Sequence, residues 1–126
     1  MRTTPDHQST AATPFVVLLT IATAVIHFSL VPAEFSKGAT GYGTLFILTG
    51  LGYLVALSIL YVPLFSKIRL LGMTLLVGIA VAAIVAYISL GYFDTLGWVT
   101  KAIEVTLLLA VGVERIVAGK TSALAA

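Results

Sequence analysis

Four apolar runs, each long enough to cross a lipid bilayer, account for most of this chain of 126 residues. Hydrophobic residues make up 60% of the chain and charged residues only 10%, whereas a soluble domain carries about 25% charged residues. A chain with so little charge cannot cover itself with polar surface, so lipid is its expected solvent. The sequence therefore predicts an all-α integral membrane protein, a four-helix bundle with short loops and no separate soluble domain.

Prolines, glycines and charged residues mark the ends of the runs. We expect membrane spans over residues 15–31, 42–62, 70–90 and 95–117. In this interpretation Pro32 ends the first span and Pro63 ends the second. A polar N-terminal tail of residues 1–14 precedes the transmembrane domain, residues 15–118, and a short tail of residues 119–126 follows it.

The first apolar run has a competing interpretation. It ends at Val31-Pro32-Ala33, which resembles the cleavage site of a secretory signal peptide. The segment before the run, however, carries a single arginine, Arg2, which Asp6 offsets, and the run is longer than a usual signal-peptide core. We therefore expect the first span to be retained as a helix.

The basic residues of the loops and tails predict the orientation. Five of them fall on one side of the predicted membrane: Arg2, Lys67, Arg69, Arg115 and Lys120. The other side has only Lys37 in its loops. By the positive-inside rule, both termini of this multi-pass protein lie in the cytoplasm, and Glu34 and Asp94 face outward across the cell membrane.

An ion pair inside the fourth span is the strongest sign of a site. Lys101 and Glu104 lie three residues apart in a run whose other charged residues, Glu114 and Arg115, lie at its inner end. A carboxylate at a helix centre costs about 2.5–3.5 kcal/mol on insertion, and each strongly apolar residue returns about 0.3–0.6 kcal/mol. Roughly a dozen apolar residues nearly balance this cost. We therefore expect the polar side of the span to pack against protein.

Depth along the spans groups five polar side chains. At about 1.5 Å per residue, Glu104 lies about 13 Å below the outer end of its span, near the midplane of a bilayer core ~30 Å thick. Lys101 lies one turn shallower, and Tyr53 falls near the level of Glu104. His27 and Tyr87 lie about one turn below the outer ends of their spans. These residues predict a buried polar pocket that opens outward, with Glu104 at its floor.

Two interpretations of this pocket stay open. In the structural one, Lys101 and Glu104 form an ion pair within the helix that offsets its own cost and fixes the helix rotation, or they contact a partner subunit. In the other, Glu104 beside His27 relays protons or binds a small cation.

His27 itself has an ordinary expected role. A histidine near a helix end donates to a carbonyl or hydroxyl group, for which Ser29 and Tyr87 are candidates. Because the second histidine, His7, falls on the opposite side, haem or metal ligation within one chain is not expected. We predict no metal and no resident cofactor.

Enzyme activity is not expected either. The chain has no cysteine, and it shows no phosphate-cradling glycine loop, no paired catalytic carboxylates and no nucleophile–base arrangement. We therefore assign no catalytic residue. The basic residues are dispersed rather than clustered, which also argues against a nucleic-acid partner.

Small residues recur at four-residue spacing on two spans. Gly78, Ala82 and Ala86 do so on the third span, and Gly52 and Ala56 do so on the second. Such spacing lets helices approach closely in lipid. We expect these residues to hold the four helices together, and the alternative is a surface for a homo-oligomer or a larger partner.

Three functional hypotheses follow. A layout of four short spans is typical of many small prokaryotic membrane families, and the first hypothesis is a non-enzymatic accessory or structural subunit of a larger membrane complex. The second is a small oligomeric transporter or proton-coupled carrier that uses the midplane carboxylate. The third is a subunit of a membrane redox complex that contacts a quinone, haem or metal held by its partners.

Overall fold

The computed structural model describes residues 10–91 and 93–126, which form four long helices and one short one. The helices are α1 (Thr13–Ser36), α2 (Thr40–Tyr61), the 3₁₀ helix η1 (Pro63–Ile68), α3 (Arg69–Leu90) and α4 (Thr95–Ala125). Each of the four long helices lies in a segment that is long and apolar enough to cross a membrane. The structure thus confirms the predicted all-α fold with four candidate transmembrane helices.

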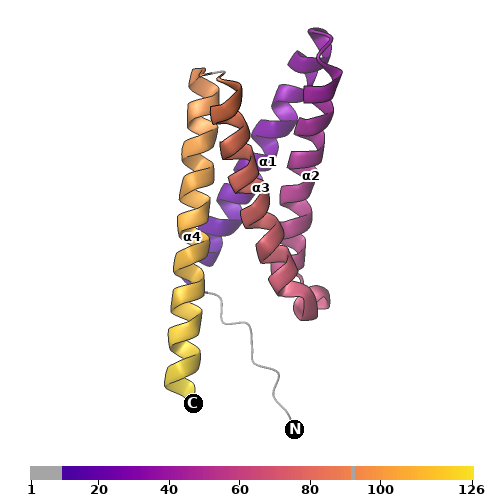
Figure 1. Cartoon of the computed structure of the whole chain (residues 1–126). Helices are drawn as coiled ribbons and strands as arrows, with labels where there is room; N and C mark the ends of the chain where they lie inside the picture. Colours follow the sequence, from indigo (N-terminus) through magenta and orange to yellow (C-terminus); the bar gives the residue numbers. More distant parts are fainter. Residues whose placement is uncertain (1–9, 92) are drawn as a thin grey trace.

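The four helices form a ring in which each contacts two neighbours. Contacts join α1 to α2, α2 to α3, α3 to α4 and α4 to α1, so that α2 and α4 lie diagonally opposite. Figure 1 shows the α1–α2 hairpin and the α3–α4 hairpin separating toward the end that carries their two short turns. At the other end, α2 and α3 converge on η1 (Figure 1).

Local sequence explains the turn between α3 and α4. Gly91 follows the last residue of α3 with φ at 70°, a left-handed conformation that glycine adopts without strain. Asp94 then caps α4, because its side chain accepts a hydrogen bond of 2.9 Å from the backbone N–H of Gly97. α3 thus ends at Leu90, and α4 begins at Thr95.

Two other helix ends differ from the sequence prediction. α1 continues through Pro32 to Ser36, which corrects the expectation that Pro32 ends the first span. A proline inside a helix removes a single N–H donor, and such losses are tolerated in membrane helices. α4 likewise continues to Ala125, through the predicted tail of residues 119–126, which contains no proline and three alanines.

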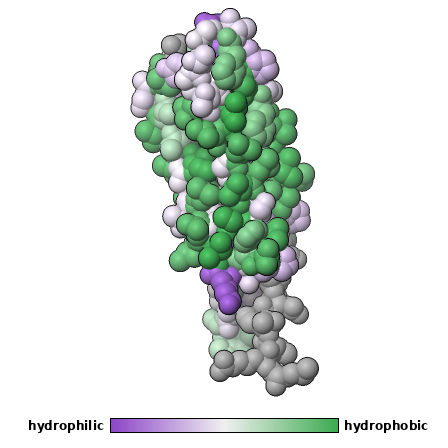
Figure 2. Space-filling model, turned by 90° about the vertical axis from the view of Figure 1, so that its right-hand side faces the viewer, coloured by the Kyte–Doolittle hydropathy of each residue, from purple (hydrophilic) through white to green (hydrophobic). Residues whose placement is uncertain are grey.

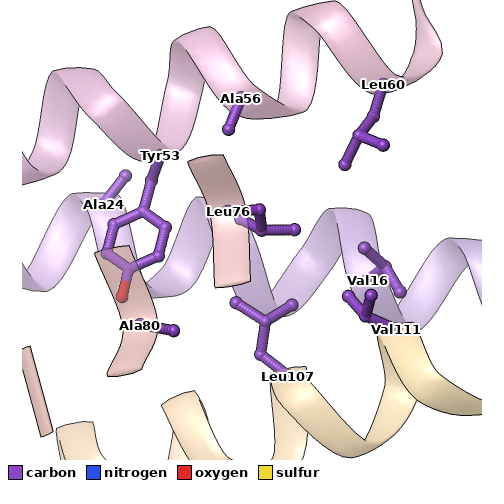
Figure 3. Packing of buried hydrophobic residues seen from close by; sticks show 9 residues of the cluster. All are labelled: Val16, Ala24, Tyr53, Ala56, Leu60, Leu76, Ala80, Leu107 and Val111. Carbon is purple, nitrogen blue, oxygen red and sulfur yellow. The ribbon is translucent and has the colours of Figure 1, made fainter. Parts of the chain in front are cut away.

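Apolar side chains fill the interior of the ring. Each long helix contributes to this core, which consists of Val16, Ala24, Tyr53, Ala56, Leu60, Leu76, Ala80, Leu107 and Val111 (Figure 3). The outer surface is also apolar: Figure 2 shows a broad hydrophobic area over the middle of the molecule, with hydrophilic residues toward its ends. An apolar exterior around an apolar core is the arrangement expected when lipid is the solvent.

The small residues of α2 and α3 face in different directions. Gly52 and Ala56 lie in the α2–α3 contact, since a methyl group at Gly52 would come within 2.6 Å of Cδ1 of Ile79. Gly78 and Ala82, in contrast, are exposed, and a methyl group at Gly78 would have no neighbour within 4 Å. This corrects the expectation that the Gly78 stripe holds the bundle together.

Candidate functional site

Glu104 is the centre of a polar cluster inside the bundle. It lies on the inward face of α4 together with Leu107 and Val111, and its side chain is 0% exposed. Oε2 accepts a hydrogen bond from the ammonium of Lys101, one turn earlier on the same helix. The structure therefore contains the intrahelical ion pair that the spacing of these two residues allows.

Tyr53 reaches the same carboxylate from the diagonal helix. Its hydroxyl donates a hydrogen bond of 3.0 Å to Oε1 of Glu104, and the residue is 0% exposed. The ring projects from α2 into the interior (Figure 3). Both carboxylate oxygens of Glu104 are thus hydrogen-bonded within the chain, one to Tyr53 and one to Lys101.

His27 brings α1 to the cluster. Its Nδ1 lies 2.8 Å from the carbonyl oxygen of Thr23, and because a carbonyl only accepts, Nδ1 carries the proton. Its Nε2 lies 3.9 Å from Oε1 of Glu104, too far for a hydrogen bond but close enough for an ion pair if the imidazole is protonated. As expected, His27 donates a hydrogen bond to a nearby group, but the acceptor is the carbonyl oxygen of Thr23 rather than Ser29 or Tyr87.

Tyr87 lies nearer the surface than the other four candidates. Its hydroxyl donates to the backbone oxygen of Asp94 at 3.2 Å. The Lys101 ammonium lies 5.7 Å from the centre of its ring, a cation–π distance. Tyr87 also packs edge-on against Trp98. The structure thus brings His27, Tyr53, Lys101 and Glu104 together. Tyr87 is linked to them, within the part of the chain that the structure describes, by its contact with Lys101.

A cavity lies above the cluster, where the hairpins separate. It has a volume of about 720 Å³, and residues from all four long helices line it. His27 and Lys101 belong to its lining, whereas Glu104, which is fully buried, does not. The turn residues Ala39 and Gly91 also line it, which places the cavity at the end that the sequence predicts to face outward.

Two buried threonines beside the cluster were not predicted. Thr20 and Thr23 precede His27 on the buried face of α1, and both are fully buried. The Thr20 hydroxyl donates to the backbone oxygen of Val16 at 2.7 Å, while no partner for the Thr23 hydroxyl occurs among the described residues. Thr23 lies three residues after Thr20 and four residues before His27, so the three side chains share one face of α1. This spacing is the signal that could have found the two threonines.

A second polar cluster was also missed by sequence reasoning. Near the other end of the bundle, Oε2 of Glu114 accepts hydrogen bonds from the hydroxyls of Tyr61 at 2.7 Å and Thr13 at 3.1 Å. These bonds join α4 to α2 and α1. Glu114 lies ten residues after Glu104, about 2.8 helical turns, so the two carboxylates lie about 80° apart around α4.

The comparisons with known proteins assign no role to this site. No family model, no curated protein and no solved structure matches this chain. The described residues contain no group of three or more His, Cys, Asp or Glu side chains that could hold a metal ion. The chemistry of the site therefore follows from its own geometry: one buried carboxylate, one ammonium, one phenol and one imidazole, which largely satisfy one another.

Proposed function

We propose that this small multi-pass membrane protein is a non-enzymatic structural or accessory subunit of a larger membrane complex, with both termini in the cytoplasm. One observation carries the proposal: Glu104 is 0% exposed, and each of its oxygens pairs with a group of the same chain. A buried carboxylate whose two oxygens are both hydrogen-bonded within the chain suits a structural role. Its partners lie on α2 and α4, with His27 of α1 close by, so it fixes how these helices face one another.

An exposed face of small residues on α3 supports the proposed contact with a partner subunit. Gly78 and Ala82 are exposed on the outside of the bundle, one turn apart. Among the described residues, no atom other than those of the adjoining helix backbone lies within 4 Å of a methyl group built at Gly78. Small residues on a lipid-facing helix allow another helix to approach closely, so this face suits a helix of a second subunit or of a second copy.

The test is purification in mild detergent, followed by size measurement and mass spectrometry of whatever copurifies. We expect the wild-type protein to elute as a complex. Gly78→Leu should release the partner without unfolding the chain, because the new side chain has open space around it. Gly112→Leu is the matched control, since Gly112 on α4 is also exposed and has nothing within 4 Å. A wild-type protein that elutes alone as a monomer would contradict the proposal.

A proton-coupled carrier is the second candidate, and the His27–Glu104 distance of 3.9 Å favours it. His27 lines the cavity, so a proton entering from that side would reach an imidazole next to the carboxylate. Against a through-path, the buried apolar residues Leu107 and Val111 lie between Glu104 and Glu114 along α4. Proton flux in liposomes that Glu104→Gln abolishes, while the variant still assembles, would favour the carrier over the subunit.

A further inference from the structure

The cavity above the polar cluster has the size of a ligand site. Its volume of about 720 Å³ falls within the range of about 300–1,000 Å³ that is typical of small-molecule pockets. Its lining includes His27 and Lys101 together with residues of the two hairpin turns. Figure 1 shows the two hairpins separating toward the end that carries these turns. The subunit role proposed above makes no use of this space.

Lys101 supplies the polar recognition in the cavity. Its side chain is 12% exposed, and its single hydrogen bond among the described residues is the one to Glu104. An ammonium has three N–H donors, so two remain for an acceptor in the cavity. Two threonine hydroxyls of the lining, those of Thr49 and Thr100, use their protons on backbone oxygens one turn earlier, at 2.8 and 2.7 Å. His27, which also lines the cavity, uses its Nδ1 proton on the carbonyl oxygen of Thr23. Lys101 can thus donate further hydrogen bonds to a ligand in the cavity.

The two lysines that line the cavity are each already paired with a carboxylate. Lys37 pairs with Glu34 at 2.9 Å near the rim, and Lys101 pairs with Glu104 at the floor. Asp94 is engaged as the cap of α4. An anionic ligand would find no uncompensated cation here, and a cationic ligand would meet the Lys101 ammonium. This balance favours a neutral acceptor such as a carbonyl oxygen.

The walls of the cavity suit an apolar body. Aromatic rings of Phe46, Tyr87 and Phe93 line it, and the small side chains of Ala83 and Ala86 leave room between them on α3. A pocket that is largely apolar, with a few convergent polar groups, fixes the orientation of a ligand by its polar end. In this cavity the polar end would point toward Lys101.

We propose that the cavity binds a neutral amphiphile whose carbonyl oxygen accepts a hydrogen bond from Lys101 and whose apolar body lies against α2 and α3. Two kinds of membrane molecule carry this chemistry: the ester carbonyl of a bilayer phospholipid, and a free isoprenoid or alkyl quinone or ketone. The proposal is independent of the subunit role, because the cavity and the Gly78 face are lined by different residues.

The test uses the only tryptophan of the chain as a reporter. Trp98 packs against Phe93 and Tyr87, with ring centres 5.7 and 5.8 Å apart, and both of those rings line the cavity. The full chain is placed in nanodiscs of ether-linked phosphatidylcholine, which has no ester carbonyl, and titrated with decyl-benzoquinone, which quenches tryptophan fluorescence. The proposal expects saturable quenching with a defined dissociation constant.

Two variants assign the binding to the cavity. Ala86→Phe fills it without changing a polar group, and the double variant Lys101→Met/Glu104→Gln removes the donor together with its counter-charge. The double variant is expected to weaken binding about tenfold or more, since a hydrogen bond to a charged group is worth about that factor. Ala86→Phe is expected to weaken binding at least as much, because its ring fills the space of the ligand. The control is Ala102→Phe, at an exposed position of α4 outside the cavity, which should leave the constant unchanged. Circular dichroism and elution volume check that each variant is folded.

The same titration in ester-linked phosphatidylcholine separates the two sources. A dissociation constant raised about tenfold by competing ester carbonyls assigns the cavity to bilayer lipid, and an unchanged constant assigns it to a free amphiphile. Quenching that never saturates, or that is as strong in folded Ala86→Phe as in the wild type, would overturn the proposal. In either case the copurification experiment with Gly78→Leu still reports on the subunit role separately.

Discussion

The Tyr53 hydroxyl donates a hydrogen bond of 3.0 Å to Oε1 of Glu104, and this bond crosses the bundle between two diagonally opposite helices. Neighbouring helices can be held by packing along their whole contact. α2 and α4 share no such contact, so this buried bond is a direct link between them. It orients both helices about their own axes, because each must present one particular side chain to the centre.

Replacing Tyr53 should therefore weaken the bundle. We expect Tyr53→Phe to lower the free energy of unfolding by about 1 kcal/mol, because hydrogen bonds between membrane helices contribute about 0.6 kcal/mol on average and up to about 1.7 kcal/mol. The measurement is reversible unfolding in mixed micelles with increasing dodecyl sulfate. Tyr42→Phe is the matched control, since Tyr42 is 39% exposed and no hydrogen bond of its hydroxyl occurs among the described residues. Equal losses in both variants would contradict a stabilising role for the bond.

The chain offers two ion pairs of the same spacing for comparison. Lys101–Glu104 is buried, with its carboxylate 0% exposed, whereas Lys37–Glu34 lies near the surface, with its lysine side chain 66% exposed. We expect Lys101→Met to cost about 3–5 kcal/mol, because it leaves a buried carboxylate without its cation. Lys37→Met should cost less than about 1 kcal/mol. The same unfolding assay measures both variants.

The double variant tests the reason for that cost. Lys101→Met/Glu104→Gln removes both charges, so it should be more stable than Lys101→Met alone. If the second substitution adds to the loss instead, the penalty in the single variant does not come from an unpaired carboxylate.

Much of the polar site follows from the sequence because depth in a membrane helix can be counted. A straight helix rises about 1.5 Å per residue, so the turn residues fix the level of each side chain to within about one turn. This is why Tyr53 and Glu104 could be placed at one level, and the structure joins them by a hydrogen bond. Tyr87 was predicted at the depth of His27, but its hydroxyl bonds to the backbone at Asp94 instead of entering the cluster.

Counting residues gives the depth of a side chain and the other residues on its helix face. It does not say whether that face points into the bundle or toward lipid. The two small-residue stripes look alike in sequence, yet Ala56 is buried and Gly78 is exposed. In a soluble protein, polarity would separate the inner from the outer face of α3. In lipid both faces are apolar, so this signal is lost. Glu114 was missed for a related reason: it lies near the end of the predicted span 95–117, where a carboxylate needs no buried partner, and its bond to Tyr61 depends on helix packing.

Replacing two glycines of α3 by alanine tests which face of the helix points into the bundle. A methyl group at Gly72 would come within 2.7 Å of Cγ2 of Ile59 and 3.2 Å of the backbone oxygen of Ala56. We expect Gly72→Ala to cost about 1–3 kcal/mol through overpacking. Gly78→Ala meets no atom within 4 Å, so it should be neutral or stabilise the monomer by up to about 1 kcal/mol. Destabilisation by Gly78→Ala in the monomer would mean that this face packs inward.

The orientation in the membrane is directly testable because the chain has no cysteine of its own. Ser36, at the end of α1, and Ser66, in η1, are both exposed and lie toward opposite ends of the bundle. With both termini in the cytoplasm, Ser36→Cys in intact cells should react with a membrane-impermeant maleimide. Ser66→Cys should react only after the membrane is permeabilised, because the basic residues Lys67 and Arg69 beside it keep that loop inside. The reverse labelling pattern would mean that the cavity opens toward the cytoplasm, and its amphiphile would then enter from that side.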